Sequence, residues 1–262
     1  MALTEQQEFR YARHLILDEV GEEGQEKLLK SRVLVVGAGG LGSPLLMYLA
    51  AAGVGALGVA DDDTVDLTNL QRQIVHSTEA VGRPKVDSAA GTLKQLNPEI
   101  RVERHKLRLD ASNAEKLVTQ YDLVADGSDN FDTRYLLNDV CHRLRKPLVS
   151  ASLYRFEGQL TTYAAWRGRT GSEGGGPCLR CVFRDKPPPD DVPRCETAGI
   201  LGAVAGVMGT MQATEVLKEL LGLGESLSGR LLLYDALSAE TRIIKLKRDP
   251  ECPTCGQGKA AA

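Results

Sequence analysis

The sequence predicts an α/β fold with a mixed sheet that is parallel in its first half and antiparallel in its second. A short apolar run at residues 33–36 leads into a glycine-rich turn and an apolar segment at 41–52, the order of a strand, a turn and a helix. Further apolar runs alternate with helical segments as far as about residue 152, as in βαβ units. Beyond that point, strands of alternating polarity follow, and two near the C-terminus form a hairpin pattern.

The individual elements follow from apolar periodicity and from the turn-forming residues between them. Helices are predicted at residues 5–17, 22–29, 41–52, 84–96, 112–120 and 130–145, with one more from about Thr197. Strands are predicted at residues 33–36, up to Asp61, and at 100–107, 121–125, 147–152, 157–165, 230–237 and 241–248.

The composition is that of a packed globular protein, with 262 residues, a net charge of −3 and a hydrophobic fraction of 42%. A slightly negative charge argues against non-specific binding of nucleic acids. The first residues are polar and charged, so no secretory signal is expected. The most apolar stretch, 198–211, is too short and glycine-rich for a membrane span and is interpreted as a buried helix. We therefore expect a cytoplasmic protein without membrane or nucleic-acid partners.

Gly37, Gly39 and Gly42 follow the first strand at the spacing GxGxxG. In a Rossmann-like fold the first glycine permits a tight turn, the second lets a phosphate approach the backbone, and the third lets the helix pack closely on the strand. The next helix directs its N–H groups at that phosphate. Asp61 ends the following strand, where a carboxylate accepts hydrogen bonds from ribose. The motif predicts a nucleotide site and, taken alone, favours NAD; a turn that serves only packing is the alternative.

Polar and basic side chains after the second strand favour ATP instead. Asn69, Gln71, Arg72 and Gln73 directly follow an acidic cluster at the nucleotide edge of the sheet, and Lys85 begins the next predicted helix. Two cations on the ligand side of one sheet can neutralise several phosphate charges. Because the pyrophosphate of a dinucleotide needs less positive charge than a triphosphate, this arrangement favours ATP.

The fourth predicted strand ends in DGSDN, which places Asp126, Asp129 and Asn130 at the carboxyl edge of the sheet, where such folds bind ligands. A hard carboxylate oxygen suits Mg²⁺ on a triphosphate, whereas a nicotinamide ring would gain nothing from it. An Asx turn that caps the next helix is the alternative, and both can hold together. The sequence therefore predicts that Asp129 binds magnesium.

Four of the six cysteines form two CxxC pairs. Cys178 and Cys181 lie in a Gly- and Pro-rich segment, residues 167–194, interpreted as a mobile loop, whereas Cys252 and Cys255 lie near the C-terminus. Two such pairs can hold one structural Zn²⁺ with every coordination position filled, which would clip the tail to the loop. Redox activity is the alternative, but two pairs without a thioredoxin-like context indicate zinc and a reducing cytoplasm.

The two remaining cysteines differ in context. Cys195 precedes the helix predicted from about Thr197, and a cysteine at a helix N-terminus can have a lowered pKa and act as a nucleophile. A role as a small apolar filler is an equal alternative. Cys141 lies inside a predicted helix and is expected in the core. The helix after Cys195 carries glycines spaced for close approach by another element, including one across a dimer interface.

These segments together resemble the ubiquitin-activating-like adenylyltransferases, the MoeB, ThiF and HesA family, over about residues 8–256. The resemblance rests on GAGGLGS, DDDTVDLTNLQRQ, GRPK, DGSDN, EGQ, the two CxxC pairs and CETAGILGAVAGVMGTMQATEVLK. It implies a single adenylation domain over residues 1–262. Its parts would be a helical arm at 1–30, a nucleotide-binding half at 31–150, and a carrier-binding half at 151–256 with the zinc site and the mobile loop.

The activity that the resemblance implies is adenylation of the C-terminal glycine of a small ubiquitin-fold sulfur-carrier protein ending in Gly-Gly, with ATP and Mg²⁺ as cofactors and pyrophosphate released. The pathway would be molybdopterin or thiamine biosynthesis or a related thiolation. A homodimer is implied because Arg13 matches an arginine that the family inserts into the neighbouring subunit's site. A desulfurase or rhodanese is a possible sulfur donor. Cys195 matches a cysteine that some members need and others do not, so the resemblance leaves its role open.

The resemblance also assigns a role to each matching residue. The catalytic residues would be Arg13, Arg72, Lys85 and Asp129, together with Cys195 in those members that need this cysteine. The nucleotide-binding residues would be Gly37, Gly39, Gly40, Gly42, Asp61, Asp63, Thr68, Asn69, Leu70, Gln71, Arg72, Lys85, Asp129 and Asn130. The zinc ligands would be Cys178, Cys181, Cys252 and Cys255.

Two other classes of function stay open at this point. A zinc-containing NAD-dependent oxidoreductase would use the glycine turn and Asp61 but would leave Arg72, Lys85 and Asp129 without a role. A non-catalytic module that binds a ubiquitin-like protein would not need intact phosphate-facing motifs. Within the family, adenylation of a modified tRNA base is disfavoured by the negative net charge and by the paired CxxC motifs.

Overall fold

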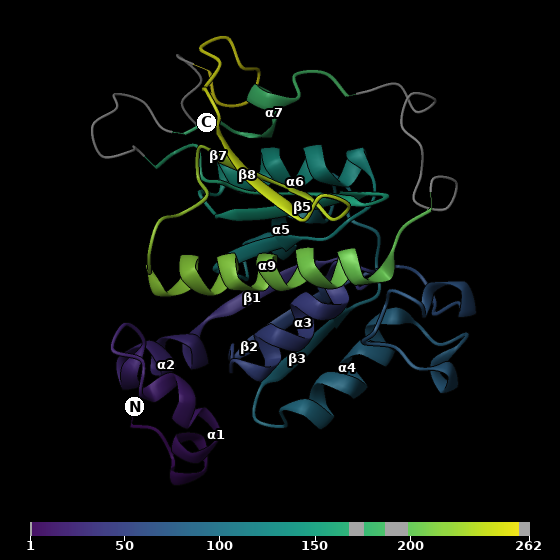
Figure 1. Cartoon of the computed structure of the whole chain (residues 1–262), viewed down its shortest axis with the longest axis vertical. Helices are drawn as coiled ribbons and strands as arrows, with labels where there is room; N and C mark the ends of the chain where they lie inside the picture. Colours follow the sequence, from purple (N-terminus) through teal and green to yellow (C-terminus); the bar gives the residue numbers. More distant parts are fainter. Residues whose placement is uncertain (1, 168–175, 187–198, 257–262) are drawn as a thin grey trace.

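The computed structural model describes residues 2–167, 176–186 and 199–256 of the chain. Its centre is one eight-stranded sheet in the order β3-β2-β1-β4-β5-β6-β7-β8 (Figure 1). The parallel strands are β1 Arg32–Val36, β2 Ala56–Ala60, β3 Arg101–His105, β4 Leu123–Asp126 and β5 Leu148–Tyr154. The antiparallel strands are β6 Glu157–Tyr163, β7 Arg230–Asp235 and β8 Glu240–Lys245. The predicted Rossmann-like mixed sheet is therefore confirmed.

Helices cover both faces of the parallel half. The described helices are α1 Glu5–Leu15, α2 Gly21–Lys30, α3 Gly42–Ala51, α4 Lys85–Leu96, α5 Ala114–Val118, α6 Phe131–Arg143, α7 Leu179–Val182 and α9 Gly202–Leu221, with short 3₁₀ turns at Leu67–Asn69 and Thr78–Ala80. Side chains of α3, α4 and α9 share one core cluster, and those of α5 and α6 share the other. Because helices cover both faces of the sheet, the central strands are buried on both sides, which explains their continuous apolar sequences.

Strand β1 shows how the sequence divides between the two faces. Val33 and Val35 join the core beneath α3, whereas Leu34 and Val36 join the core beneath α6. Alternate residues of a strand point to opposite faces, so a strand buried on both sides must be apolar throughout. Helix α3 is almost wholly apolar for a related reason, because α9 packs on the side that the sheet leaves free (Figure 1).

The N-terminal helices lie at the edge of the sheet opposite the glycine turn. The side-chain amide of Asn97, just after α4, donates to the hydroxyl of Tyr11 at 2.9 Å and to the carbonyl of Ala50 at 2.8 Å. The amide of Gln25 donates to the carbonyl of Ala52 at 3.0 Å. Both carbonyls belong to the C-terminal end of α3, so the helical arm is fixed to the ends of the helices that lie furthest from the glycine turn.

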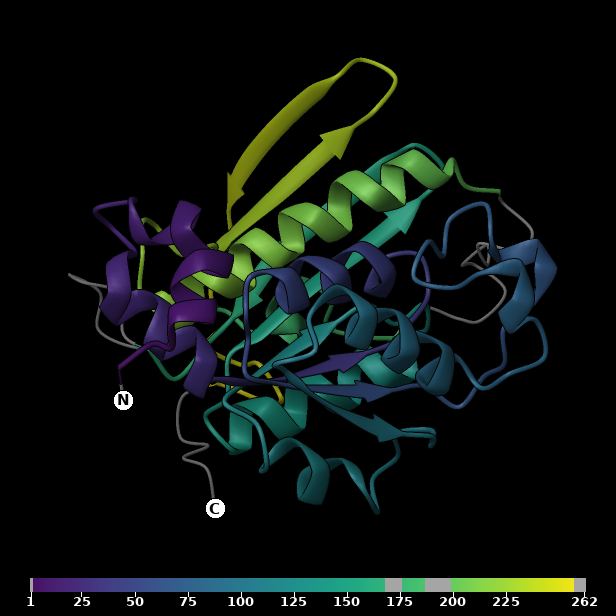
Figure 2. The same cartoon turned by 90° about the horizontal axis from the view of Figure 1, so that it is seen from below.

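The hairpin of β7 and β8 projects from the body of the molecule (Figure 2). All six residues of β8 are exposed, which fits the alternating, partly charged sequence of this edge strand. Strand β5 spans residues 148–154 and thus crosses the predicted border between the two halves at residue 150. One sheet consequently carries both halves.

The predicted start of the last long helix was wrong in the described part. Residues 199–201 are not helical, with Gly199 at φ 74° and Leu201 extended, and α9 begins at Gly202; Thr197 lies outside the described residues. A Cβ placed on Gly202 would lie 2.2 Å from the carbonyl oxygen of Gln71. One placed on Gly209 would lie 2.5 Å from that of Leu41. These two glycines allow close packing within the chain, as their spacing predicted, and the dimer interface considered for this helix stays a prediction.

Candidate nucleotide site and tetracysteine cluster

The glycine turn between β1 and α3 has the close packing that its motif predicts. Gly37 has φ 91°, a conformation that favours glycine. A Cβ on Gly42 would lie only 1.9 Å from the carbonyl oxygen of Gly37, so a side chain at Gly42 would force the helix away from the strand. The N-terminus of α3 therefore opens directly above the turn, in the position where a helix attracts an anion.

Asp61 holds the shape of this turn. One carboxylate oxygen accepts a hydrogen bond from the backbone N–H of Ala38 at 2.8 Å, and the other accepts one from the N–H of Asp63 at 2.9 Å. The carboxylate thus bridges the glycine turn and the loop after β2. It lies at the end of β2 beside the turn, where the predicted ribose contact requires a carboxylate.

The DGSDN loop after β4 meets the same turn. A Cβ on Gly37 would lie 2.9 Å from the carbonyl oxygen of Gly127, and one on Gly127 would lie 3.3 Å from the backbone nitrogen of Gly42. Asp129 follows two residues later and is exposed. The structure therefore brings Asp129 to the edge of the sheet that carries the glycine turn.

The polar residues of this loop differ in their hydrogen bonding. Asp126 is fully buried and accepts hydrogen bonds from the N–H and hydroxyl of Ser128 and from the hydroxyl of Ser150. Asn130 caps α6 by accepting the N–H of Thr133 at 2.9 Å. Asp129 makes no hydrogen bond or ion pair with any described residue. Asn130, rather than Asp129, therefore provides the helix cap that was predicted as an alternative, and the Asp129 carboxylate is left available to a ligand.

The two predicted phosphate-binding cations follow the acidic loop and make different contacts. Lys85 has a side chain only 8% exposed, and its Nζ lies 2.6 Å from Oδ2 of Asp63. Partial burial works to raise the pKa of Asp63, but the hydrogen bond from Lys85 and the N–H of Thr64 bring it below its usual value. The side-chain stem of Arg72 packs 3.5 Å from a Cβ placed on Gly40, and its guanidinium donates to the carbonyl of Thr68.

The remaining predicted nucleotide contacts lie on the short turn that directly precedes Arg72. Asp66 accepts the N–H of Thr68 at 2.8 Å and so starts the 3₁₀ turn that presents Asn69 and Leu70. Gln71 is exposed, and its carbonyl faces Gly202 of α9. The predicted nucleotide residues thus gather on the loops that follow β1, β2 and β4.

Arg13 lies apart from this group. It is exposed on α1, and it forms no hydrogen bond or ion pair within the described part of the chain. The arm packs at the C-terminal end of α3, whereas the glycine turn precedes its N-terminus. The ten residues of α3 span about 15 Å, so Arg13 does not reach the glycine turn of its own chain.

Sequence reasoning counted Gln73 among the polar residues that favour ATP but assigned it no specific contact, and it did not single out His76 or the start of α9. Gln73 and His76 are buried against the glycine turn, and the first turn of α9 meets it through Ala205, 3.4 Å from a Cβ placed on Gly40. His76 bonds the carbonyl of Ala38 through Nε2 at 2.9 Å. The sequence signal for Gln73 and His76 was that both are polar and lie close to the predicted nucleotide-binding loop. No local sequence signal indicates where α9 begins.

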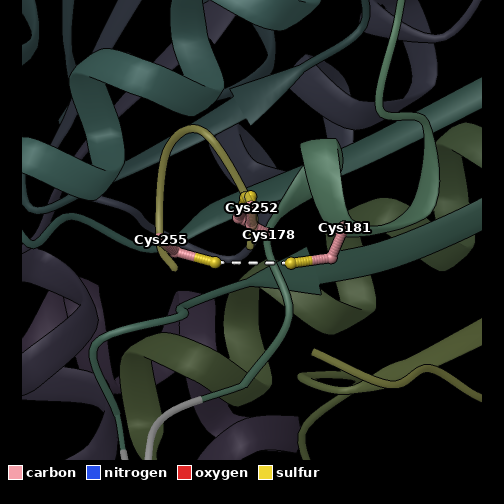
Figure 3. A group of neighbouring side chains, drawn as sticks. All are labelled: Cys178, Cys181, Cys252 and Cys255. Carbon is pink, nitrogen blue, oxygen red and sulfur yellow. Dashed lines mark hydrogen bonds between the residues drawn. The ribbon is translucent and has the colours of Figure 1, made fainter. Parts of the chain in front are cut away.

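The four paired cysteines meet at one point although their two pairs are distant in the sequence (Figure 3). All four sulfur atoms lie within 4.8 Å of one another, with 3.5 Å between Cys178 and Cys252 and 3.3 Å between Cys181 and Cys255. Tetrahedral Zn–S bonds of about 2.3 Å place sulfurs about 3.8 Å apart. The donor set thus fits zinc.

Helix α6 anchors both arms of this cluster. Asn138 accepts the backbone N–H of Leu179 at 2.8 Å. The Asp139 carboxylate pairs with Arg180 at 2.8 Å and accepts the hydroxyl of Thr254 at 2.7 Å. The Asp139 carboxylate therefore contacts one residue from each CxxC segment. These contacts attach both segments to α6 without requiring a metal.

The chain then runs from the cluster back along α6 toward its N-terminus. The hydroxyl of Tyr135 bonds the carbonyls of Phe183 and Asp185 at 2.8 and 3.0 Å, and Lys186 pairs with Asp132 in the first turn of the helix. The described segment thus ends near Asp129. Cys195 follows in the part that lies outside the described residues, so its predicted role stays a prediction.

The expectation for Cys141 is confirmed, because its side chain is only 1% exposed and packs in the core beneath α6. Burial raises the pKa of this thiol well above its usual value, so it stays neutral and unreactive. Among the described helices, none has the length and apolar character needed to cross a bilayer.

The fold and the glycine turn define an α/β protein of the Rossmann class with a tetracysteine cluster on its antiparallel side. Within that class the chain belongs to the ThiF family, whose model matches residues 11–254. The resemblance inferred from the motifs is thereby confirmed.

Individual relatives are similar over most of the chain. The SAMP-activating enzyme E1 of Haloferax volcanii is 52% identical over 95% of this chain and 89% of its own length. The sulfur carrier protein adenylyltransferase of Thermus thermophilus is 49% identical over 98% of this chain and 93% of its own length. The adenylyltransferase and sulfurtransferase MOCS3 of Bos taurus is 51% identical, and the chain spans only 55% of it.

Solved structures agree on the fold. A crystal structure of Escherichia coli MccB with ATP superposes with a TM-score of 0.77 at 23% identity, covering 94% of this chain and 74% of that one. A structure of MccB with MccA-N7isoASN gives a TM-score of 0.79 over 94% of this chain and 75% of that one. At this level of identity the likeness extends to the fold alone.

Proposed function

We propose that the protein is an adenylyltransferase that uses ATP to activate the C-terminal glycine of a small ubiquitin-fold sulfur-carrier protein ending in Gly-Gly, releasing pyrophosphate. The observation that carries this proposal is that one edge of the sheet holds several groups suited to binding a nucleoside triphosphate. The glycine turn, the cations Arg72 and Lys85, and the unpaired carboxylate of Asp129 all lie there. The names of the relatives that cover most of the chain support it.

The chemistry suits these residue types. A glycine carboxylate is already ionised at neutral pH, so its attack on the α-phosphorus needs no general base. The obstacle is the approach of one anion to another. Arg72 and Lys85 supply positive charge where the phosphates lie, and the N-terminus of α3 adds its dipole. Catalysis then consists of positioning and charge neutralisation. Lys85 must exchange its partner Asp63 for a phosphate as the nucleotide binds.

Asp129 is the residue proposed to hold Mg²⁺. Its carboxylate is exposed and has no described partner, which suits a hard metal ion that keeps several water ligands. A bound magnesium ion would neutralise triphosphate charge. The four clustered cysteines are proposed to hold Zn²⁺ as a closed structural site, with Asp139 fixing both arms around it.

The exposed position of Arg13 supports a homodimer with shared sites. Since Arg13 does not reach the glycine turn of its own chain, its proposed contact with phosphate requires a second copy. Mixing two inactive variants, Arg13→Ala and Asp129→Asn, tests this. Random exchange of subunits should make about one quarter of the sites intact and restore activity that neither variant has alone. Absence of any restored activity after verified exchange would contradict the shared site.

The biological setting is proposed from the same chemistry. Thiols that hold zinc need a reducing compartment, so we place the protein in the cytoplasm. The carrier would act in molybdopterin or thiamine biosynthesis or a related thiolation pathway, with a desulfurase or rhodanese as the sulfur donor. Cys195 would either take part in sulfur transfer or serve only as an apolar filler.

The direct test is exchange of labelled pyrophosphate into ATP with purified protein, magnesium and a candidate carrier. We expect exchange that depends on the carrier and is lost when its terminal glycines are removed. Exchange without carrier, or no exchange with any candidate carrier, would overturn the proposal. Thermal unfolding with MgATP and with NAD separates the oxidoreductase alternative, since only MgATP should raise the unfolding temperature.

A further inference from the structure

We propose that the side-chain amide of Gln73 donates a hydrogen bond to a phosphate of the bound nucleotide. This inference rests on the proposed function and deepens it, because it adds a neutral donor to the charged contacts of Arg72 and Lys85. It arises from a polar side chain that is buried without a partner at the glycine turn.

Gln73 is 4% exposed, and its Oε1 is buried with no hydrogen-bond partner. No described residue bonds its Nε2 either. Leaving a buried amide oxygen without a partner costs free energy, so native proteins rarely do so. Rotating the amide by half a turn exchanges oxygen and nitrogen without moving the side chain. Either orientation therefore presents unused hydrogen-bonding capacity at the same place.

That place is the second glycine of the motif. A Cβ built on Gly39 would point at Nε2 of Gln73 from 3.6 Å, and the adjacent Arg72 faces Gly40 in the same way. The second glycine of such a turn is the position at which a phosphate approaches the backbone. The free amide therefore borders the space that a phosphate would enter.

The backbone around Gln73 is tied to the glycine turn. Its N–H donates to the carbonyl of Asn69 at 3.0 Å, and its carbonyl accepts the N–H of His76 at 3.0 Å. The ring of His76 spans from the carbonyl of Ala38 to the hydroxyl of Ser88, at 2.9 Å each. The short turn is thus hydrogen-bonded to the glycine turn, which holds the backbone of Gln73 beside it.

A phosphate is the ligand chemistry that fits this position. Its oxygens accept hydrogen bonds, and an amide N–H can meet one at the turn without adding further charge to a site that already has two cations. We expect a neutral donor of this kind to change the affinity about 3- to 10-fold, which corresponds to about 0.7–1.4 kcal/mol.

The variant Gln73→Met keeps the length of the side chain and removes the amide, and Gln120→Met on the exposed surface is its control. We would measure binding of adenosine, AMP, ADP and ATP with magnesium, together with thermal unfolding without ligand. Gln73→Met should weaken phosphate-bearing ligands about 3- to 10-fold, leave adenosine unchanged, and unfold at the same or a higher temperature. Gln73→Glu, which sets a negative charge against the phosphate, should weaken ATP further.

Equal affinities for ATP in the wild type and both Gln73 variants would overturn the inference. A loss that includes adenosine to the same extent would also overturn it, since the residue would then act on the fold of the site. A raised KM for the carrier with unchanged nucleotide affinity would instead assign the amide to the carrier tail, and the inference would fail. Failure of the proposed function is distinguishable, because it appears as absence of ATP binding or exchange in the wild type.

Discussion

The nucleotide edge and the tetracysteine cluster differ in what holds them together. At the nucleotide edge, backbone contacts fix the geometry: Gly42 packs on Gly37, and Asp61 binds the N–H of Ala38. The cysteine cluster joins two segments whose partners are separated by 74 positions in the sequence. Asn138 and Asp139 anchor these segments to α6, and Arg184 pairs with Asp249 between them, but among the described residues these contacts lie outside the group of four thiols.

This difference indicates that the two regions tolerate different kinds of damage. The nucleotide edge should be sensitive to added volume, because its parts touch through backbone atoms that cannot yield. The cluster should be sensitive to loss of a ligand, because a metal site loses its affinity when one donor is removed. Helix α6 links them, since its N-terminus adjoins Asp129 and its second half carries Asn138 and Asp139.

The largest effect is expected from a methyl group at the glycine turn. Gly42→Ala would place a Cβ 1.9 Å from the carbonyl oxygen of Gly37 and should lower the free energy of unfolding by about 3 kcal/mol or more. Gly206→Ala on α9 is the control, because a Cβ there meets nothing within 4 Å and should stabilise the helix by about 1 kcal/mol. Denaturant unfolding measures both. Equal stability of the two variants would show that the turn is not tightly packed.

The second effect concerns Asp129 and is expected in activity. Asp129→Asn removes the proposed magnesium ligand and should slow pyrophosphate exchange by about 100- to 1,000-fold, with unfolding unchanged since the residue is exposed and unpaired. Asp62→Asn, also exposed on the same edge, should retain exchange close to that of the wild type. Full exchange in the Asp129 variant would remove the metal from the proposed mechanism.

The third effect tests the cluster. Cys181→Ser should abolish binding of zinc, measured by atomic emission, and should remove the stabilisation that zinc gives. That stabilisation is about 2.7 kcal/mol when free zinc exceeds its Kd 100-fold. Cys141→Ser is the control outside the cluster and should retain about one zinc per chain. Affinity for MgATP should stay unchanged in both, because the nucleotide edge is fixed by other contacts. Zinc retained in the Cys181 variant would rule out a four-thiol site.

The smallest effect concerns pH. Burial lowers the pKa of His76 in the folded protein, and the nearby positive charge of Lys85 also lowers it. The hydrogen bond between His76 and the carbonyl of Ala38 acts in the opposite direction but does not cancel these effects. The unfolded chain therefore binds more protons, and stability should fall as the pH drops through and below the usual histidine value of about 6.5, by at most about 1.4 kcal/mol per pH unit. His76→Gln should reduce this slope in unfolding measured from pH 7.5 to 5.5, and the rest of the slope comes from His105 and His142, whose pKa values burial also lowers. His14→Gln, whose residue is partly exposed on α1, should leave it unchanged; equal slopes in all three proteins would contradict the assignment.

The sequence allowed the order of strands and helices and the position of the glycine turn to be predicted, because periodicity and the GxGxxG spacing are local. The ends of elements were less accurate. The strand predicted at 100–107 covers only Arg101–His105, and the helix predicted at 112–120 covers only Ala114–Val118. Propensity changes gradually along the chain, whereas hydrogen bonding starts and stops at particular residues.

The residue types and their spacing along the chain were enough to predict which residues could serve the chemistry, since glycines, cations, a carboxylate and paired cysteines stand at spacings that the chemistry requires. Which of these residues meet in space depends on the folded structure. In the folded structure Asn130 caps α6, so that Asp129 has no partner among the described residues, and Lys85 pairs with Asp63. Arg13 lies at the opposite end of the sheet from the glycine turn. The reason is physical: spacing along the chain limits neighbours within one element, but contacts between elements depend on how the whole core packs.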